Sequence, residues 1–278
     1  MRKICLITGG SSGMGLETAK LLGKEYDIII ASRNEKKLIN AINELKELGI
    51  DAKYQILDMS DKNSIINMID NLKKIGKIDL LINCAGMSPH MGDYKKIIDS
   101  NAIGNVILNN EILNIMNGGV IINVSSMSSY LTPSLILPKR KYKLAFKNIE
   151  KLRKKLYKRS KLFPNGVRSG VAYGISKNFL TWFSIAFSVK AIKNNVRVLV
   201  VSPGNFDTNM GKLEEDEAKK FIEQSVLHRN GNPKEIAYLF KSLIDKDNSY
   251  LTGVEIILDG GVYAYNKNKK IINLIKEN

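Results

Sequence analysis

The sequence predicts a doubly wound α/β fold, in which helices cover both faces of a parallel sheet. Short apolar runs without polar alternation recur along the 278 residues, and longer amphipathic segments lie between them. Strands buried on both faces give such continuous apolar runs, and helices packed on a sheet repeat apolar residues every three or four positions. The length suits one large domain, and the hydrophobic content of 44% is ordinary for a soluble globular protein.

Seven segments are expected to form the strands, because each is short and rich in Ile, Val and Leu. They are Lys3–Thr8, Asp27–Ser32, Ala52–Leu57, Ile78–Asn83, Val120–Ser125, Val196–Val201 and Val254–Leu258. Helices are expected at Met14–Lys24, Glu35–Leu48, Asp61–Ile75, Tyr94–Met116 and Ala172–Ile192. Parallel sheets of this kind bind ligands beyond the carboxyl ends of their strands, so the candidate site residues are sought there.

Composition and charge exclude several kinds of protein. No run approaches the roughly 18 apolar residues that span a bilayer, and the start of the chain lacks the pattern of a signal peptide, so we expect a cytoplasmic protein. Cys5 and Cys84 fall in apolar segments and are interpreted as free thiols. The two histidines are far apart, so no metal site is expected, and we expect no nucleic-acid partner.

The positive charge is concentrated in one segment. Lys139–Arg168 contains thirteen Lys or Arg and one acidic residue, so it carries +12 of the net +16 and leaves +4 for the rest of the chain. It lies within residues 130–170, which separate a predicted strand from the next helix, where a connection is usually short. We interpret 130–170 as a basic insertion in a single domain of residues 1–265, with 266–278 as a tail.

An apolar stripe is predicted on a basic helix of this insertion, formed by Ala145, Ile149, Leu152 and Leu156. Four roles stay open: a lid over a ligand, a docking patch for an acidic carrier or an anionic ligand, a helix on a membrane surface, and a solvated appendage. Basic amphipathic helices are typical of membrane surfaces, but this stripe is modest. We expect it to pack on the domain beside the predicted site, with the lysines facing water.

The first predicted strand ends in a glycine-rich turn that opens a helix, Thr8-Gly9-Gly10-Ser11-Ser12-Gly13-Met14-Gly15. Glycines let the backbone approach a pyrophosphate closely, and the N–H groups at the helix start hold the anion. The turn therefore predicts a dinucleotide site, because it follows a strand, precedes a helix and lies in the first βαβ unit. The expected contacts are Gly9, Ser11, Ser12, Gly13, Met14 and Gly15.

The end of the second strand bears on the kind of dinucleotide. An NAD site usually has an acidic residue there, which accepts hydrogen bonds from the ribose. Here the strand ends in Ser32 and Arg33, and a guanidinium can bind a 2′-phosphate through two hydrogen bonds. NADP is therefore the predicted cofactor, with NAD as the alternative. Asp58, after the third strand, is expected either to contact the adenine amino group or to cap a helix.

Tyr173 and Lys177 are four residues apart on a predicted helix, so their side chains lie on one face. A phenol with an ordinary pKa near 10 is a poor proton shuttle at neutral pH, and a nearby ammonium favours the phenolate. The fifth strand ends in Ser125 and Ser126, and a serine hydroxyl there can stabilise negative charge on a substrate oxygen.

Together these motifs resemble those of the short-chain dehydrogenase/reductase family, over roughly residues 3–263. The resemblance implies a Rossmann fold with a seven-stranded sheet, and it implies that Asn101, Ser126, Tyr173 and Lys177 are the catalytic residues. Asn101 matches the asparagine that holds a proton-relay water, and Ser125 is the less favoured neighbour of Ser126. The cofactor residues implied are Asn83, Ala85, Gly86, Tyr173, Lys177, Pro203, Gly204 and Thr208, and the C-terminal signature is Thr252-Gly253 with Asp259-Gly260-Gly261.

Two departures from the family pattern stand out. The spacing of 47 residues from Ser126 to Tyr173 is far longer than usual, as in some carbonyl reductases and hydroxysteroid dehydrogenases with a helical insertion here. In those relatives the insertion borders the substrate pocket and can block the helix-pairing face through which members of the family usually dimerise. A homo-oligomer is therefore one possible state of this protein, but its interface is left open. In addition, Gly10-Ser11-Ser12 lacks the basic residue that many NADP-dependent members have.

The resemblance implies an NADP-dependent carbonyl reductase or alcohol dehydrogenase acting on a small hydrophobic carbonyl or alcohol. The substrate pocket is expected between the loops at residues 87–91, 127–138 and 205–213 and the insertion. One alternative is a reductase of 3-oxoacyl thioesters; another is an enoyl reductase, against which the four-residue spacing of Tyr173 and Lys177 argues. A third is a non-catalytic NADP-binding scaffold whose basic insertion binds an acidic partner.

Overall fold

A parallel sheet of seven strands forms the centre of the protein, in the order β3-β2-β1-β4-β5-β6-β7. The computed structural model describes residues 2–208 and 215–268. The strands are β1 Lys3–Thr8, β2 Tyr26–Ser32, β3 Ala52–Ile56, β4 Leu80–Asn83, β5 Gly119–Val124, β6 Val196–Pro203 and β7 Val254–Leu258. The strand order reverses between β1 and β4, so the carboxyl ends of these two strands flank the point at which ligands bind such sheets. The predicted fold class is confirmed.

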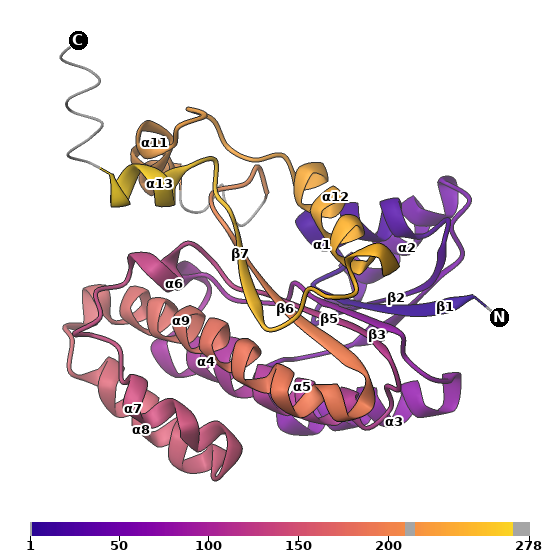
Figure 1. The fold of residues 1–278 in the computed structure, drawn as a ribbon, viewed down its shortest axis with the longest axis horizontal. Helices are drawn as coiled ribbons and strands as arrows, with labels where there is room; N and C mark the ends of the chain where they lie inside the picture. The colour runs from indigo at the N-terminus through magenta and orange to yellow at the C-terminus, as the bar shows by residue number, and fades with distance from the viewer. Residues whose placement is uncertain (1, 209–214, 269–278) are drawn as a thin grey trace.

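Helices cover both faces of the sheet (Figure 1). On one face lie α1 Gly13–Leu22, α2 Glu35–Glu47 and α12 Pro233–Ile244; on the other lie α3 Lys62–Ile75, α4 Tyr94–Ile98, α5 Gly104–Leu113 and α9 Asn165–Ala191. The shorter elements include α6 Ser128–Leu131, α11 Glu215–Gln224 and α13 Val262–Lys267. No helix in the described ranges is long and apolar enough to cross a membrane.

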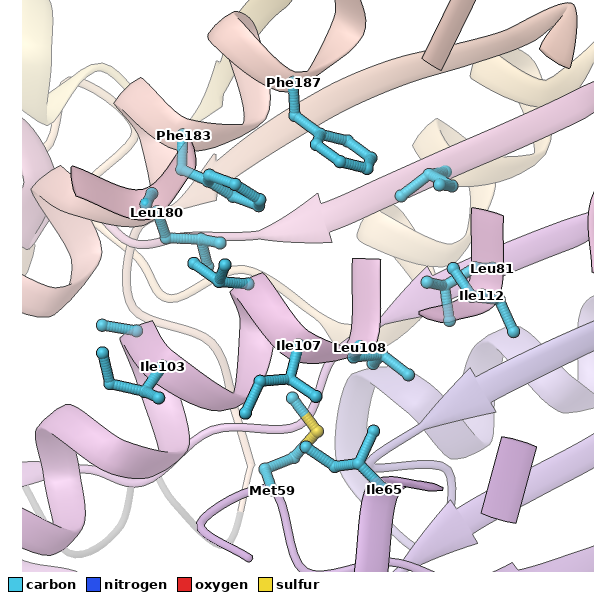
Figure 2. Close-up of a cluster of buried hydrophobic side chains, with 14 of the residues drawn as sticks. Met59, Ile65, Leu81, Ile103, Ile107, Leu108, Ile112, Leu180, Phe183 and Phe187 are labelled. Atoms are coloured by element: carbon cyan, nitrogen blue, oxygen red, sulfur yellow. The ribbon is translucent and has the colours of Figure 1, made fainter. Parts of the chain in front are cut away.

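Each sheet face has its own hydrophobic core, because side chains alternate along a strand. On β1, Cys5 and Ile7 are buried toward α1 and α12, whereas Leu6 is buried in the other core. Figure 2 shows this second core, in which Phe183 and Phe187 of α9 and Ile107 and Leu108 of α5 are among the labelled residues.

The prediction of one continuous helix at Tyr94–Met116 is wrong. It is divided into α4, a π-helical turn at Asp99–Ile103, and α5. Apolar periodicity does not reveal such a turn, because the flanking helical pattern continues through it. The predictions also omitted α12, although Asn232 and Glu235 form a capping box at its start and Pro233 occupies its first position, which is a signal readable in the sequence.

The basic insertion packs on α9 and α4 through α7 Lys139–Tyr142 and α8 Ile149–Lys161. Leu152 and Leu156 are fully buried, so the predicted packing of the stripe on the domain is confirmed. Ala145 is buried too, but it lies in a 3-10 turn before α8 and not on the same helix. Tyr142 is fully buried against Phe179 and Trp182 of α9.

Candidate active site

A cleft of about 920 Å³ runs along the carboxyl ends of the strands. It extends from the glycine-rich turn after β1 to the start of α9, and most residues singled out from the sequence line it. These are Gly9, Ser11, Ser12, Gly13, Met14, Gly15, Arg33, Ala85, Gly86, Ser126, Tyr173, Lys177, Pro203, Gly204 and Thr208. Asp58, Asn83 and Asn101 are not among the lining residues, and their positions are described below.

The glycine-rich turn needs its glycines for two physical reasons. Gly9 and Gly13 have φ of 68° and 54°, which side chains rarely tolerate. A Cβ on Gly15 would lie 2.5 Å from the carbonyl oxygen of Gly9, so a larger residue would force the turn apart. At the N-cap of α1 the Ser12 side chain makes no capping hydrogen bond, and the N–H groups at the start of a helix suit an anionic ligand.

Four polar residues at the end of β2 and the start of α2 border the cleft: Ser32, Arg33, Asn34 and Lys37. The Ser32 hydroxyl oxygen is buried and has no hydrogen-bond partner among the described residues. Buried polar atoms are rarely left unpaired, so this hydroxyl fits a ligand group. Sequence reasoning missed Lys37; its spacing of four from Arg33 at the start of a predicted helix was the available signal.

Asp58 lies beside this end of the cleft. One of its carboxylate oxygens accepts hydrogen bonds from the backbone N–H and the hydroxyl of Ser60, at 2.8 and 2.6 Å. Burial alone would raise the Asp58 pKa, but the bonds from Ser60 and the positive charge of Arg33 outweigh it and lower the pKa. The cap of α3 is Asp61, not Asp58. The adenine contact of Asp58 stays a prediction.

Asn83 and Asn101 do not line the cleft, and their side chains form hydrogen bonds to the elements around it. The Thr8 hydroxyl donates to Asn83 Oδ1 at 2.5 Å, and Asn83 Nδ2 donates to the side-chain oxygens of Asn105 and Asn123, so Asn83 joins three strands to α5. The Asn101 carboxamide pairs with both backbone groups of Met87, each at 2.8 Å. Both residues therefore position the loop after β4, which lines the cleft.

The two serines after β5 have different surroundings. The Ser125 hydroxyl donates to the Lys177 carbonyl and accepts from Thr181, both at 2.9 Å, so its hydrogen bonds serve the packing of α9. The Ser126 hydroxyl accepts from the Ser128 N–H at 3.2 Å, and no acceptor for its own proton occurs among the described residues. Ser126 is thus better placed than Ser125 to donate to a ligand.

Tyr173 and Lys177 lie one turn apart on α9, where both line the cleft. Lys177 is buried, and its ammonium donates to the Val124 carbonyl at 3.0 Å and lies 5.7 Å from the centre of the Tyr173 ring. Burial raises the pKa of the neighbouring Cys84 thiol to about 12, and the positive charge of Lys177 only partly opposes this. The site therefore pairs a phenol with a fixed positive charge.

The loop after β6 forms another wall of the cleft. The Gly204 N–H donates to the Leu258 carbonyl at 2.9 Å, and a Cβ on Gly204 would lie 2.8 Å from the Cα of Asp259. The Thr208 methyl group lies 3.2 Å from the position of a Cβ on Gly13, so this loop contacts the glycine-rich turn. Of the expected substrate loop 205–213, residues 209–213 lie outside the described residues, as do residues 269–278 of the expected tail.

Comparison with known proteins agrees with this geometry. The family model described as "short chain dehydrogenase" matches residues 3–136, and the one described as "Enoyl-(Acyl carrier protein) reductase" matches residues 161–263. An uncharacterized oxidoreductase, YxbG of Bacillus subtilis, is 29% identical over 95% of this chain and 92% of its own. Carbonyl reductase family member 4 of Xenopus laevis is also 29% identical, over 95% of this chain and all of its own.

A solved structure has the same fold. The short chain dehydrogenase from Burkholderia cenocepacia in complex with NADP has a TM-score of 0.74 and 19% identity, and the match covers 94% of this chain and 98% of that one. The chain belongs to the short-chain dehydrogenase/reductase family and is an oxidoreductase that uses a nicotinamide cofactor. The glycine-rich turn and the unpartnered Ser32 hydroxyl fit such a dinucleotide.

Proposed function

We propose that the protein is an NADP-dependent reductase of a hydrophobic carbonyl compound, or a dehydrogenase of the corresponding alcohol, with Tyr173 as the acid/base. The observation that supports this most strongly is a single cleft. It brings the glycine-rich turn after β1 together with Ser126, Tyr173 and Lys177. A non-catalytic scaffold has no need of this second group of residues.

The chain's own residues supply the proton chemistry. A bound nicotinamide supplies the hydride for the substrate carbon. Tyr173 donates its proton to the substrate oxygen, and the nearby Lys177 ammonium stabilises the phenolate that remains. The Ser126 hydroxyl donates a hydrogen bond to the same oxygen and stabilises the charge that develops there. In the reverse direction Tyr173, as the phenolate, accepts the alcohol proton.

The end of β2 supports NADP over NAD. Arg33 and Lys37 both border the cleft next to Ser32, and no acidic residue lines the cleft within the described ranges. Two cations suit a 2′-phosphate, which carries negative charge and accepts several hydrogen bonds. A carboxylate that would select the unphosphorylated ribose is missing from the end of this strand.

The substrate end of the cleft supports a hydrophobic substrate. Its apolar lining includes Met91, Leu131, Pro133, Ile136 and Val167. Leu131, Pro133, Ile136 and Val167 lie in residues 130–170, so the ends of the insertion border the substrate and α8 does not. Because α8 packs on α9 and α4, the parts of these two helices that it covers are not available for pairing with a second copy.

A turnover assay tests this proposal. The purified protein is mixed with NADPH or NADH and with a panel of ketones, quinones, 3-oxoacyl thioesters and enoyl thioesters, and cofactor absorbance is followed. We expect oxidation of NADPH with a carbonyl compound and none with enoyl thioesters. Turnover of enoyl thioesters alone, or cofactor binding without turnover of any panel member, contradicts it.

A further inference from the structure

The insertion carries a stripe of lysines along one side of α8. Four exposed lysines follow one another on α8 at steps of three and four residues, so they lie on one face of the helix: Lys151, Lys154, Lys158 and Lys161. A fifth exposed lysine, Lys147, lies just before the start of the helix. We call these five residues the cationic face. None of them takes part in an ion pair within the described ranges, and the only acid on α8, Glu150, pairs with Arg153.

Exposed apolar side chains lie near the end of this stripe, and one of them lines the cleft. Leu162 follows Lys158 by one turn and is 65% exposed, and Leu135 and Val167 are 87% and 54% exposed. Arg159 draws the loop containing Leu135 to α8, because its guanidinium donates to the Leu135 and Ile136 carbonyls. We call Leu135, Leu162 and Val167 the apolar rim; Val167 also lines the cleft.

The composition of this surface favours a lipid bilayer over a protein as its partner. Protein interfaces are depleted of lysine and depend on buried Tyr, Trp and Arg anchors. Lysine is a compact charge without a preferred geometry, which suits the diffuse negative potential of an anionic lipid surface. Exposed aliphatic side chains beside such charges can enter the boundary between headgroups and acyl chains.

We propose that the cationic face and the apolar rim seat the protein on an anionic phospholipid surface. The buried side of α8, with Leu152 and Leu156, stays packed on the domain, so the helix lies over the bilayer and only the rim enters it. The mouth of the cleft then faces the lipid. This surface does not depend on the proposed catalytic function, and its test measures binding alone.

The test is co-sedimentation of the full chain with vesicles of phosphatidylcholine alone or with an equal share of phosphatidylglycerol. We expect binding to the anionic vesicles, little binding to the neutral ones, and release by high salt. The double variant Lys154→Glu/Lys158→Glu is expected to lose the binding. Its control, Lys46→Glu/Lys53→Glu, reverses two exposed lysines at α2 and β3 and is expected to keep it.

A second pair of variants tests the rim. Leu135→Ser/Leu162→Ser is expected to weaken binding to anionic vesicles several-fold, whereas Val189→Ser/Ile192→Ser, at the far end of α9, is not. Circular dichroism confirms that each variant is folded. The proposal is overturned if neutral vesicles bind the protein equally well, or if the cationic-face variant binds as wild type does. It is also overturned if the protein binds immobilised polyglutamate but not anionic vesicles, a result that would indicate an acidic protein as the partner.

Discussion

Arg153 of the insertion lies 3.0 Å from the carboxylate of Asp99, the residue at which the π-helical turn before α5 begins. Tyr157, one turn further along α8, donates a hydrogen bond to the other oxygen of the same carboxylate. The π-helical turn also carries Asn101, whose carboxamide holds the backbone of Met87 at the cleft. The insertion thus contacts the turn that positions one wall of the site.

Replacing Arg153 by methionine leaves the half-buried Asp99 carboxylate without its cation while keeping the length of the side chain. We expect the free energy of unfolding to fall by about 1–3 kcal/mol. We also expect kcat to fall while the affinity for the cofactor is unchanged, because the affected turn supports the substrate side. Urea unfolding and steady-state kinetics measure both. The control is Lys154→Met on the exposed side of α8, and equal behaviour of the two variants refutes this role of Arg153.

The insertion is part of the hydrophobic core and not an appendage. Leu156 is fully buried between α8 and the domain, so Leu156→Ala is expected to lower the free energy of unfolding by about 2–5 kcal/mol. The matched change Lys158→Ala, two residues along on the exposed side, is expected to alter it by less than about 0.5 kcal/mol. Chemical denaturation of both variants measures the difference, and a loss below about 1 kcal/mol for Leu156→Ala contradicts the packing.

The sequence predicts the sheet and the cleft well because both depend on local signals. Apolar runs locate all seven strands to within two residues at either end, and the glycine-rich turn and the Tyr173–Lys177 spacing are motifs of fixed geometry. The π-helical turn at Asp99–Ile103 has no such signal. Asn83 was expected at the cofactor and Asn101 was expected to hold a proton-relay water; neither residue is among those that line the cleft, and both roles stay predictions. Tertiary packing decides whether a polar side chain faces a ligand or the interior, and the residues next to it in the sequence do not reveal this.

Arg33 is expected to set the preference for NADP over NAD. A charge-assisted contact with a 2′-phosphate contributes roughly 1.5–3 kcal/mol, so Arg33→Ala should lower the ratio of kcat/KM for NADPH to that for NADH by about ten- to a hundredfold. Lys37→Ala is expected to lower the same ratio to a lesser degree, because an ammonium lacks the planar pair of donors with which a guanidinium binds a phosphate. A wild-type preference for NADH, or an unchanged ratio in Arg33→Ala, argues against NADP.

Cys84 lines the cleft, yet its thiol is expected to react slowly with alkylating reagents. Burial raises its pKa from 9.0 to about 12, so at mildly alkaline pH its thiolate fraction is smaller than that of an ordinary cysteine. The reaction rate should keep rising with pH past the range in which N-acetylcysteine reaches its plateau. Iodoacetamide labelling followed by mass spectrometry of the Cys84 peptide measures this, and rapid labelling near neutral pH contradicts the shifted pKa.

The central claim is that Tyr173 supplies the proton in the redox reaction. Tyr173→Phe removes the hydroxyl and keeps the ring, so the cleft and the cofactor contacts stay intact. Loss of a general acid typically costs two to four decades in rate, so we expect kcat to fall by at least about a hundredfold. Binding of NADPH, measured by fluorescence titration of the same variant, should change little. Turnover within about tenfold of wild type, in a variant that still binds NADPH, would contradict the assignment of Tyr173.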